Sequence, residues 1–303
     1  MNVYEETQLI LHKYKIQANK SLGQNFLVDD NVIDEIIRCS NIDKKDLIIE
    51  IGPGLGVLTN RLLQESNNVI AVELDKRMVS ILQDRFKLNI NGDVESHLEI
   101  INEDILKINL NQLIAEKRSN NEIKQVKIVA NLPYYISTPI IMKLLENRLD
   151  IDEIIVMVQK EVAERLTAKT GTRLAGAITY AVEYYSEAES IIKVPKESFV
   201  PSPKVESEVI KLTVRKEKKI QVQDEKLLFD IISKSFMQRR KTLSNALLNN
   251  NIINNKDDVE KMWKKLGINE KVRGESLTLE QFGTIADYIT NKNNSLIIKK
   301  KMI

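Results

Sequence analysis

The sequence is poor in the residue types that build disulfides, metal sites and catalytic triads. It has 303 residues but only one cysteine, Cys39, and two histidines, His12 and His97. A lone cysteine excludes an internal disulfide, and these three residues show no spacing typical of a zinc site. We therefore expect no metal and no histidine-based nucleophilic catalysis.

Long apolar runs are lacking as well. No stretch approaches the roughly 18 consecutive apolar residues of a membrane span, and residues 1–20 mix acids and bases where a secretory signal needs an apolar segment. Hydrophobic residues make up 43% and charged residues 29%, as in globular proteins long enough for one large domain and a smaller one. We expect a cytoplasmic, monomeric protein without a membrane partner.

Charge is divided unevenly along the chain. Residues 1–214 hold 26 Lys+Arg and 32 Asp+Glu, a net of −6, whereas residues 215–303 hold 19 and 11, a net of +8. Clustered basic charge is typical of nucleic-acid binding, although a basic helical surface without such a role explains the composition equally well. We predict two domains, 1–214 and 215–303, with residues 215–219 as the linker.

The first domain alternates short apolar runs with segments of helical period, which predicts an α/β fold with a parallel sheet and helices on both faces, as in Rossmann-like proteins. Two more strands should complete the edge of the sheet, and residues 215–303 should form a small, all-helical domain. The expected strands are 47–51, 69–73, 98–101, 127–130, 154–158, 190–194 and 207–214.

A glycine-rich turn follows the first of these strands. Gly52, Gly54 and Gly56 lie where the carboxyl end of a parallel strand meets a helix, which is where such folds bind ligands. The next strand ends at Glu73, whose carboxylate is placed to accept both hydroxyls of an adenosine ribose. The spacing G-x-G-x-G differs from the G-x-G-x-x-G of dinucleotide sites. A ligand with an adenosine and an amino acid but no phosphate, S-adenosylmethionine, therefore fits better than NAD.

Asp104 closes the third strand and has two interpretations. Its carboxylate could accept from the amino group of the cofactor's adenine, or it could be a turn or helix-capping aspartate. The sequence favours neither.

The most specific motif is Asn131-Leu132-Pro133-Tyr134, which the fourth strand delivers to the same edge of the sheet. An adenine N6 is a poor nucleophile until acceptors hold both of its hydrogens. The Asn131 amide oxygen and the Leu132 carbonyl can do this while the Tyr134 ring stacks on the base and Pro133 stiffens the loop. Taken alone, the motif would favour a simple turn beside a packed tyrosine.

These motifs together resemble the ribosomal small-subunit adenine dimethyltransferase family. The resemblance covers nearly the whole chain and is carried by residues 20–27, 50–56, 73–75, 131–139, 159–167, 199–207 and 239–247.

The resemblance implies a role for several residues. Asn25 and Leu27 would contact the cofactor's methionine end and Gly52 would lie beneath it, while Glu73 would hold the ribose. The remaining implied contacts are Asp104 with the adenine, Asn131 between cofactor and substrate, and Phe199 as an aromatic that helps sandwich the target base. Tyr135 receives no role, because many relatives carry asparagine there.

The implied substrate is a pair of adjacent adenines near the 3′ end of small-subunit (16S) rRNA in a pre-30S particle. Each would become N6,N6-dimethyladenosine by direct displacement from S-adenosylmethionine, which leaves as S-adenosylhomocysteine, and orientation would carry the rate without a strong general base.

Three alternatives remain open. They are a macrolide-resistance methyltransferase of 23S rRNA, a ribosome-assembly factor whose binding role dominates, and a dinucleotide-dependent oxidoreductase. The RNA-binding candidates are Arg239, Arg240 and Lys241, although one or two of them could instead brace a contact between domains.

Overall fold

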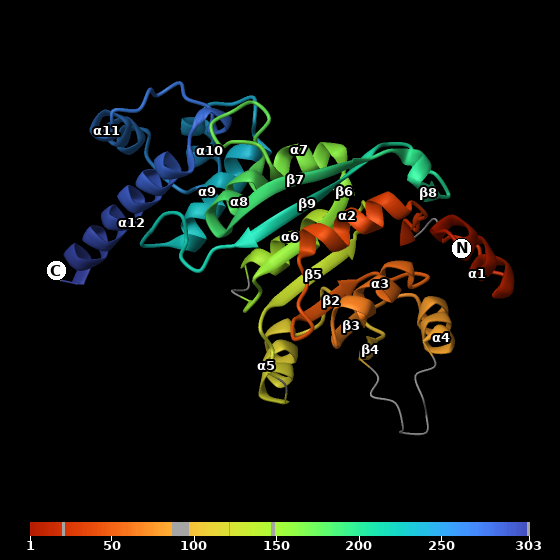
Figure 1. Ribbon diagram of the computed structural model, residues 1–303. Coiled ribbons are helices and arrows are strands. Elements are labelled where there is room, and N and C mark those ends of the chain that lie inside the picture. Colours follow the sequence, from red (N-terminus) through yellow and green to blue (C-terminus); the bar gives the residue numbers. More distant parts are fainter. Residues whose placement is uncertain (20–21, 87–96, 121, 147–148, 302–303) are drawn as a thin grey trace. The chain divides into compact units, whose positions relative to one another are not determined.

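The computed structural model describes residues 1–19, 22–86, 97–120, 122–146 and 149–301 (Figure 1). The chain forms two compact units. The first comprises Met1–Ala163 and Glu187–Val214, and the second comprises Glu164–Ser186 and Arg215–Ile303. Over the described ranges, no helix has the length and apolar character needed to cross a membrane.

A seven-stranded sheet forms the centre of the first unit, in the order β4-β3-β2-β5-β6-β9-β7. The strands β4, β3, β2, β5 and β6 are parallel, and β9 runs antiparallel to β6. This confirms the expected α/β, Rossmann-like fold, including its added edge strands. The bounds are β2 (Leu47–Ile51), β3 (Asn68–Val72), β4 (Leu98–Ile101), β5 (Val126–Asn131), β6 (Glu153–Gln159), β7 (Ser186–Val194) and β9 (Ser207–Val214).

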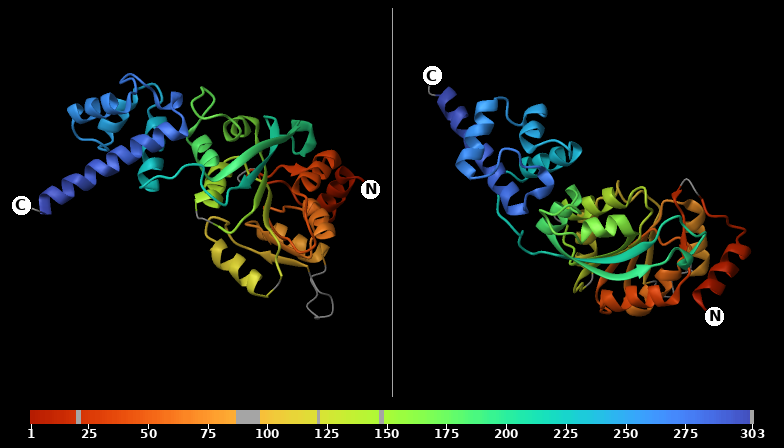
Figure 2. Two further views of the ribbon diagram at one scale, coloured as in Figure 1. Left: turned by 60° about the vertical axis from the view of Figure 1, so that its left-hand side comes forward. Right: turned by 90° about the horizontal axis from the view of Figure 1, so that it is seen from above.

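Helices cover both faces of this sheet, as the two views in Figure 2 show. Every residue of β2 is buried, which explains why this strand is a continuous apolar run apart from one glutamate. Right-handed crossovers place helices on opposite faces where the chain reverses its direction across the sheet. One face carries α2 (Asp30–Ser40), α3 (Val57–Glu65) and α4 (Lys76–Arg85), and the other carries α5 (Leu110–Asn120) and α6 (Ser137–Glu146).

A separate two-stranded sheet joins distant parts of the first unit. β1 (Phe26–Leu27) pairs antiparallel with β8 (Phe199–Val200), with Leu27 opposite Phe199. The N-terminal helix α1 (Val3–Lys13) is tied to α4 by an ion pair between Arg85 and Glu6. The pairing of β1 with β8 holds residues 26–27 beside the segment that leads into β9.

The second unit is all-helical, as expected for the C-terminal part. Its elements include α8 (Ala177–Tyr185), α9 (Glu225–Met237), α10 (Leu243–Asn249), α11 (Lys256–Leu266) and α12 (Leu279–Lys301). Two helix ends in this unit have the features typical of caps. Gly267 closes α11 with a left-handed φ of 67°, and Thr278 and Gln281 exchange hydrogen bonds at the start of α12.

Residues 164–186 belong to the second unit, whereas the sequence placed them in the first. The reason is Tyr180 on α8. Its hydroxyl donates to the Leu277 carbonyl at 2.6 Å, and its ring meets Phe282 edge-on with centroids 5.1 Å apart. With this segment included, the second unit holds 22 Lys+Arg and 13 Asp+Glu, and the first holds 23 and 30. The two units therefore differ in charge more than the two sequence segments do.

Candidate active site

A pocket opens at the carboxyl edge of the sheet, where β2 lies between β3 and β5. The chain runs outward from β2 through β3 to β4 and then returns to β5, so this is the point where the strand order reverses and where α/β sheets bind ligands. The lining residues come from segments far apart in the sequence: 22–27, 50–58, 72–74, 103–105 and 131–140.

The glycine-rich turn after β2 forms the floor of the pocket. Gly52 has φ of 71° and Gly56 has φ of 79°, conformations that L side chains rarely adopt. A Cβ on Gly56 would also lie 2.6 Å from Leu82 Cδ2. The turn therefore needs glycine to bring the chain from β2 into α3 with its backbone facing the pocket.

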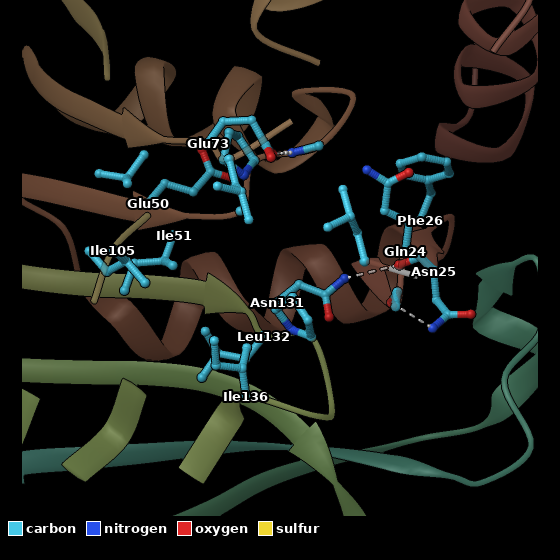
Figure 3. A pocket seen from close by; sticks show the side chains of 18 of the residues that line it. Gln24, Asn25, Phe26, Glu50, Ile51, Glu73, Ile105, Asn131, Leu132 and Ile136 are labelled. Atoms are coloured by element: carbon cyan, nitrogen blue, oxygen red, sulfur yellow. Dashed lines mark hydrogen bonds between the residues drawn. The ribbon is translucent and has the colours of Figure 1, made fainter. Parts of the chain in front are cut away.

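Glu73 follows β3 and lines the pocket (Figure 3). Its Oε2 accepts from the Gly54 N–H at 3.1 Å, and its Oε1 accepts from the Asp75 N–H at 2.8 Å. The side chain is buried, and burial raises the pKa of its carboxyl group. The glycine turn and the start of α4 thus fix the position of this carboxylate.

Glu50 is a second buried carboxyl group in the same pocket, and the sequence interpretation gave it no role. It is 2% exposed, and Thr59 Oγ1 donates to its Oε2 at 2.6 Å. Burial, together with the negative charge of the nearby Glu73, raises the pKa of Glu50 to about 8 despite this hydrogen bond. An acidic residue inside an otherwise apolar, two-face-buried strand was the signal that could have identified it.

Asp104 lines the pocket and also shapes a turn. Its Oδ1 accepts from the Leu106 N–H at 2.9 Å, and its carbonyl accepts from the Lys107 N–H at 2.8 Å. A carboxylate has two oxygens, so this turn is compatible with a contact to adenine, and that contact stays a prediction.

The tetrapeptide 131–134 enters the pocket directly from β5. Asn131 Nδ2 donates to the Asn25 carbonyl at 3.3 Å, and the Leu132 N–H donates to the Met157 carbonyl at 3.2 Å. A turn follows, in which the Ile136 N–H donates to the Pro133 carbonyl at 3.1 Å. Since the Asn131 amide nitrogen is engaged, the amide oxygen is the atom of this side chain suited to accept from a ligand.

Two adjacent tyrosines lie at this end of the pocket. The Tyr134 hydroxyl is 2.7 Å from Ser207 Oγ, and burial raises the pKa of that hydroxyl. Tyr135 also lines the pocket and is 59% exposed. Both tyrosines therefore form part of the pocket lining.

The segment 22–27 forms the opposite wall of the pocket and includes the predicted contacts Asn25 and Leu27. Gln24, which the sequence interpretation left without a role, donates from Nε2 to Asp75 Oδ2 at 2.9 Å. This bond ties the wall to the strand end that carries Glu73. The first two residues of the family-like motif, Lys20 and Ser21, lie outside the described residues.

Phe199 is not among the described residues that line the pocket. It is 3% exposed and belongs to a core cluster with Leu27, Val28 and Val194. Its pairing with Leu27 places it behind the pocket wall, a relationship between distant segments that the sequence could not reveal. Its predicted role in holding the target base stays a prediction.

The basic cluster Arg239, Arg240 and Lys241 lies exposed in the turn between α9 and α10. Arg239 is engaged within the second unit: its Nε donates to Glu275 Oε2 at 2.5 Å, and its Nη2 donates to the Arg173 carbonyl. Arg239 therefore makes its contacts within its own unit. Phosphate binding by these residues stays a prediction.

No group of three or more His, Cys, Asp or Glu side chains among the described residues is arranged to hold a metal ion.

The chain matches known proteins over almost its full length. Residues 15–291 match the family model "Ribosomal RNA adenine dimethylase". The ribosomal RNA small subunit methyltransferase A of Lachnoclostridium phytofermentans is 45% identical over 289 residues, which cover 95% of this chain and 97% of that protein. The protein of the same name from Alkaliphilus metalliredigens is 43% identical over 280 residues, covering 92% and 94%.

Two of the solved structures that are similar to this one are rRNA or adenosine methyltransferases by name. A dimethyladenosine transferase from Plasmodium falciparum has a TM-score of 0.71 and 26% identity, and the match covers 88% of this chain and 98% of that one. The 23S rRNA methyltransferase ErmE has a TM-score of 0.63 and 21% identity over 88% of this chain and all of its own, which shows a shared fold.

Proposed function

Because the chain belongs to the ribosomal RNA adenine dimethylase family, we propose that it converts two adjacent adenines near the 3′ end of small-subunit rRNA to N6,N6-dimethyladenosine. One observation carries the proposal: the glycine turn with Glu73 and the tetrapeptide with Asn131 line a single pocket. Cofactor and target base can therefore meet there.

The pocket suits S-adenosylmethionine. Gly52 has no side chain, and the space that a Cβ would occupy is open, since the nearest atom to it is the Asn131 carbonyl oxygen at 3.8 Å. A ligand can therefore approach the Gly52 backbone closely. Glu73 supplies a fixed carboxylate for the ribose hydroxyls, Asp104 an acceptor for the adenine amino group, and residues 25–27 a wall for the methionine end. When bound, this cofactor supplies a methyl group already activated on a sulfonium.

The tetrapeptide would prepare the acceptor nitrogen. The Asn131 amide oxygen and the Leu132 carbonyl accept the two amino hydrogens of adenine N6, which directs the nitrogen lone pair toward the methyl group. The Tyr134 ring stacks on the base and holds it in line. The nitrogen loses its proton after the transfer, so the site needs orientation more than a strong base.

The second unit would bind the rRNA backbone in a pre-30S particle. Its 22 Lys+Arg against 13 Asp+Glu favour phosphate binding, whereas the acidic first unit selects a locally unstacked base. Phosphate contacts position an RNA without reading its sequence. The second unit would therefore bind the RNA, and the first unit would carry out the chemistry.

The names of the relatives favour the small subunit over 23S rRNA as the substrate, because the proteins at 43–45% identity are small-subunit enzymes and the likeness to ErmE rests on fold. A dominant binding role in ribosome assembly is compatible with this activity.

Mass spectrometry of 16S and 23S rRNA from cells with and without the gene tests the proposal. We expect N6,N6-dimethyladenosine to disappear from 16S rRNA without the protein and to return with it. Unchanged 16S rRNA, or a loss confined to 23S rRNA, would contradict the proposal.

A further inference from the structure

Ser207 lies behind the substrate end of the pocket and makes a direct contact with Tyr134. It is the first residue of β9 and pairs in register with Gln159 of β6. Its side chain is 1% exposed, and its Oγ lies 2.7 Å from the Tyr134 hydroxyl oxygen. The Ser207 hydroxyl therefore has the phenol as a partner at a buried position.

This contact fixes Tyr134 at the end of its side chain as well as at its backbone. Ser137 Oγ donates to the Tyr134 carbonyl at 3.3 Å, and the Pro133–Ile136 turn shapes the chain on either side. A tyrosine ring attached only through its Cβ can change rotamer, whereas one whose hydroxyl is hydrogen-bonded must break that bond to do so. The bond to Ser207 thus selects one orientation of the ring.

We propose that Ser207 is a positioning residue for methyl transfer, which holds the Tyr134 ring in the plane that the target base stacks on. The inference rests on the proposed function. Ser207 is not among the described residues that line the pocket, and its side-chain hydrogen bond goes to Tyr134. Its effect should therefore fall on the substrate and leave the cofactor unaffected.

The bond can be removed from either side. Ser207→Ala and Tyr134→Phe each delete one hydroxyl, Ser207→Thr keeps the hydroxyl in a strand that tolerates a β-branched residue, and the double variant deletes both. Ser66→Ala is the matched control, since Ser66 is also buried and its Oγ donates a hydrogen bond at 2.6 Å to the Asp46 carbonyl, away from the pocket.

Single-turnover methyl transfer to unmethylated small subunits, cofactor affinity by calorimetry and the melting temperature should be measured for each variant. We expect Ser207→Ala and Tyr134→Phe to slow transfer about 2- to 12-fold, as for the loss of one net hydrogen bond. The double variant should be no slower than the slower single variant, because both changes break the same bond. Ser207→Thr should restore the rate, and cofactor affinity should stay within about 2-fold of wild type.

Several results would overturn the positioning role. If the fold-losses in rate of the two single variants multiply in the double variant, the two hydroxyls act separately. If Ser207→Ala transfers methyl groups at the wild-type rate, the bond does not matter. Ser66→Ala and Ser207→Ala could also lower the melting temperature equally and slow methyl transfer equally. That result would show that the slowdown is a general packing effect. If the wild-type protein itself transfers no methyl group to 16S rRNA, the proposed function fails first, and the two failures are thus distinguishable.

Discussion

Asn131 and Asn25 are joined by a hydrogen bond across the pocket, in which Asn131 Nδ2 donates to the Asn25 carbonyl at 3.3 Å. The two residues are more than a hundred positions apart in the sequence, and each is predicted to contact a ligand. The bond orients the Asn131 amide and ties the segment 22–27 to the tetrapeptide 131–134.

Asn131→Ala should slow methyl transfer by about 10²–10³, the typical effect of losing one preorganised polar group. RNA affinity should change far less, because the amide matters most as N6 develops positive charge. Single-turnover rates and RNA binding should be compared with Asn245→Ala, a control at an exposed position of α10. A rate within a few-fold of wild type would contradict the assigned role.

Glu73→Ala should weaken S-adenosylmethionine binding by about 1–3 kcal/mol, the loss expected for hydrogen bonds to a charged group. Isothermal calorimetry measures this directly, with Glu189→Ala at an exposed position of β7 as the control. Glu73→Gln should lose less, since it keeps one acceptor oxygen. Equal affinities for wild type and Glu73→Ala would remove Glu73 from the cofactor site.

The stability of the ligand-free protein should fall as the pH rises from about 5 to 8, in part because of Glu50. Its pKa is about 8 in the folded protein and lower when unfolded, near the usual value for glutamate. The folded state therefore binds more protons in this window, and the stabilisation present at low pH is lost as the pH passes through the folded pKa. Thermal unfolding against pH should show a steeper fall for wild type than for Glu50→Gln, and identical slopes would contradict the shifted pKa.

Substitutions at Phe199 distinguish a role in stacking on the target base from a role in packing the core. If it stacks on the target base, Phe199→Ala should impair transfer through the loss of about 1–3 kcal/mol of base stacking, while Phe199→Tyr and Phe199→Trp should retain much of the activity. If it only packs behind Leu27, as its burial suggests, all three variants should lose melting temperature and activity together. Transfer rates and melting curves of the three variants distinguish these outcomes.

The role of the basic cluster can be measured from the salt dependence of binding to small subunits. Neutralising Arg240 and Lys241 together should flatten the log-log slope by about 0.7–0.9 for each phosphate that the protein no longer neutralises, without changing cofactor affinity. Arg239→Ala should instead lower the melting temperature, because Arg239 binds Glu275 and the Arg173 carbonyl. Parallel lines for wild type and the double variant would show that Arg240 and Lys241 do not bind phosphate.

Much of the fold could be predicted because it depends on local patterns. Every residue of β2 is buried, so this strand appears as an apolar run, and its predicted limits agree with the structure. The limits predicted for β4 and β9 agree as well. The glycine turn and the motif at Asn131 could be placed at one edge because parallel strands present their carboxyl ends together.

Relationships between distant segments could not be predicted in the same way. The sequence of α8 does not show that its Tyr180 packs against Phe282, which comes much later in the chain. Likewise, an aromatic residue before two prolines gave no sign that Phe199 would pair with Leu27 and be buried. Each of these depends on a partner far away in the sequence, which only the folded structure identifies.

The pairing of β1 with β8 also has a consequence for biosynthesis. Leu27 emerges early from the ribosome that makes this chain, but its partner Phe199 emerges only after most of the first unit has been translated. Until then the wall formed by residues 22–27 lacks its neighbouring strand, and loop closure across that separation is entropically costly. The nascent chain should therefore complete this pocket late, after the parallel strands and the glycine-rich turn have been made.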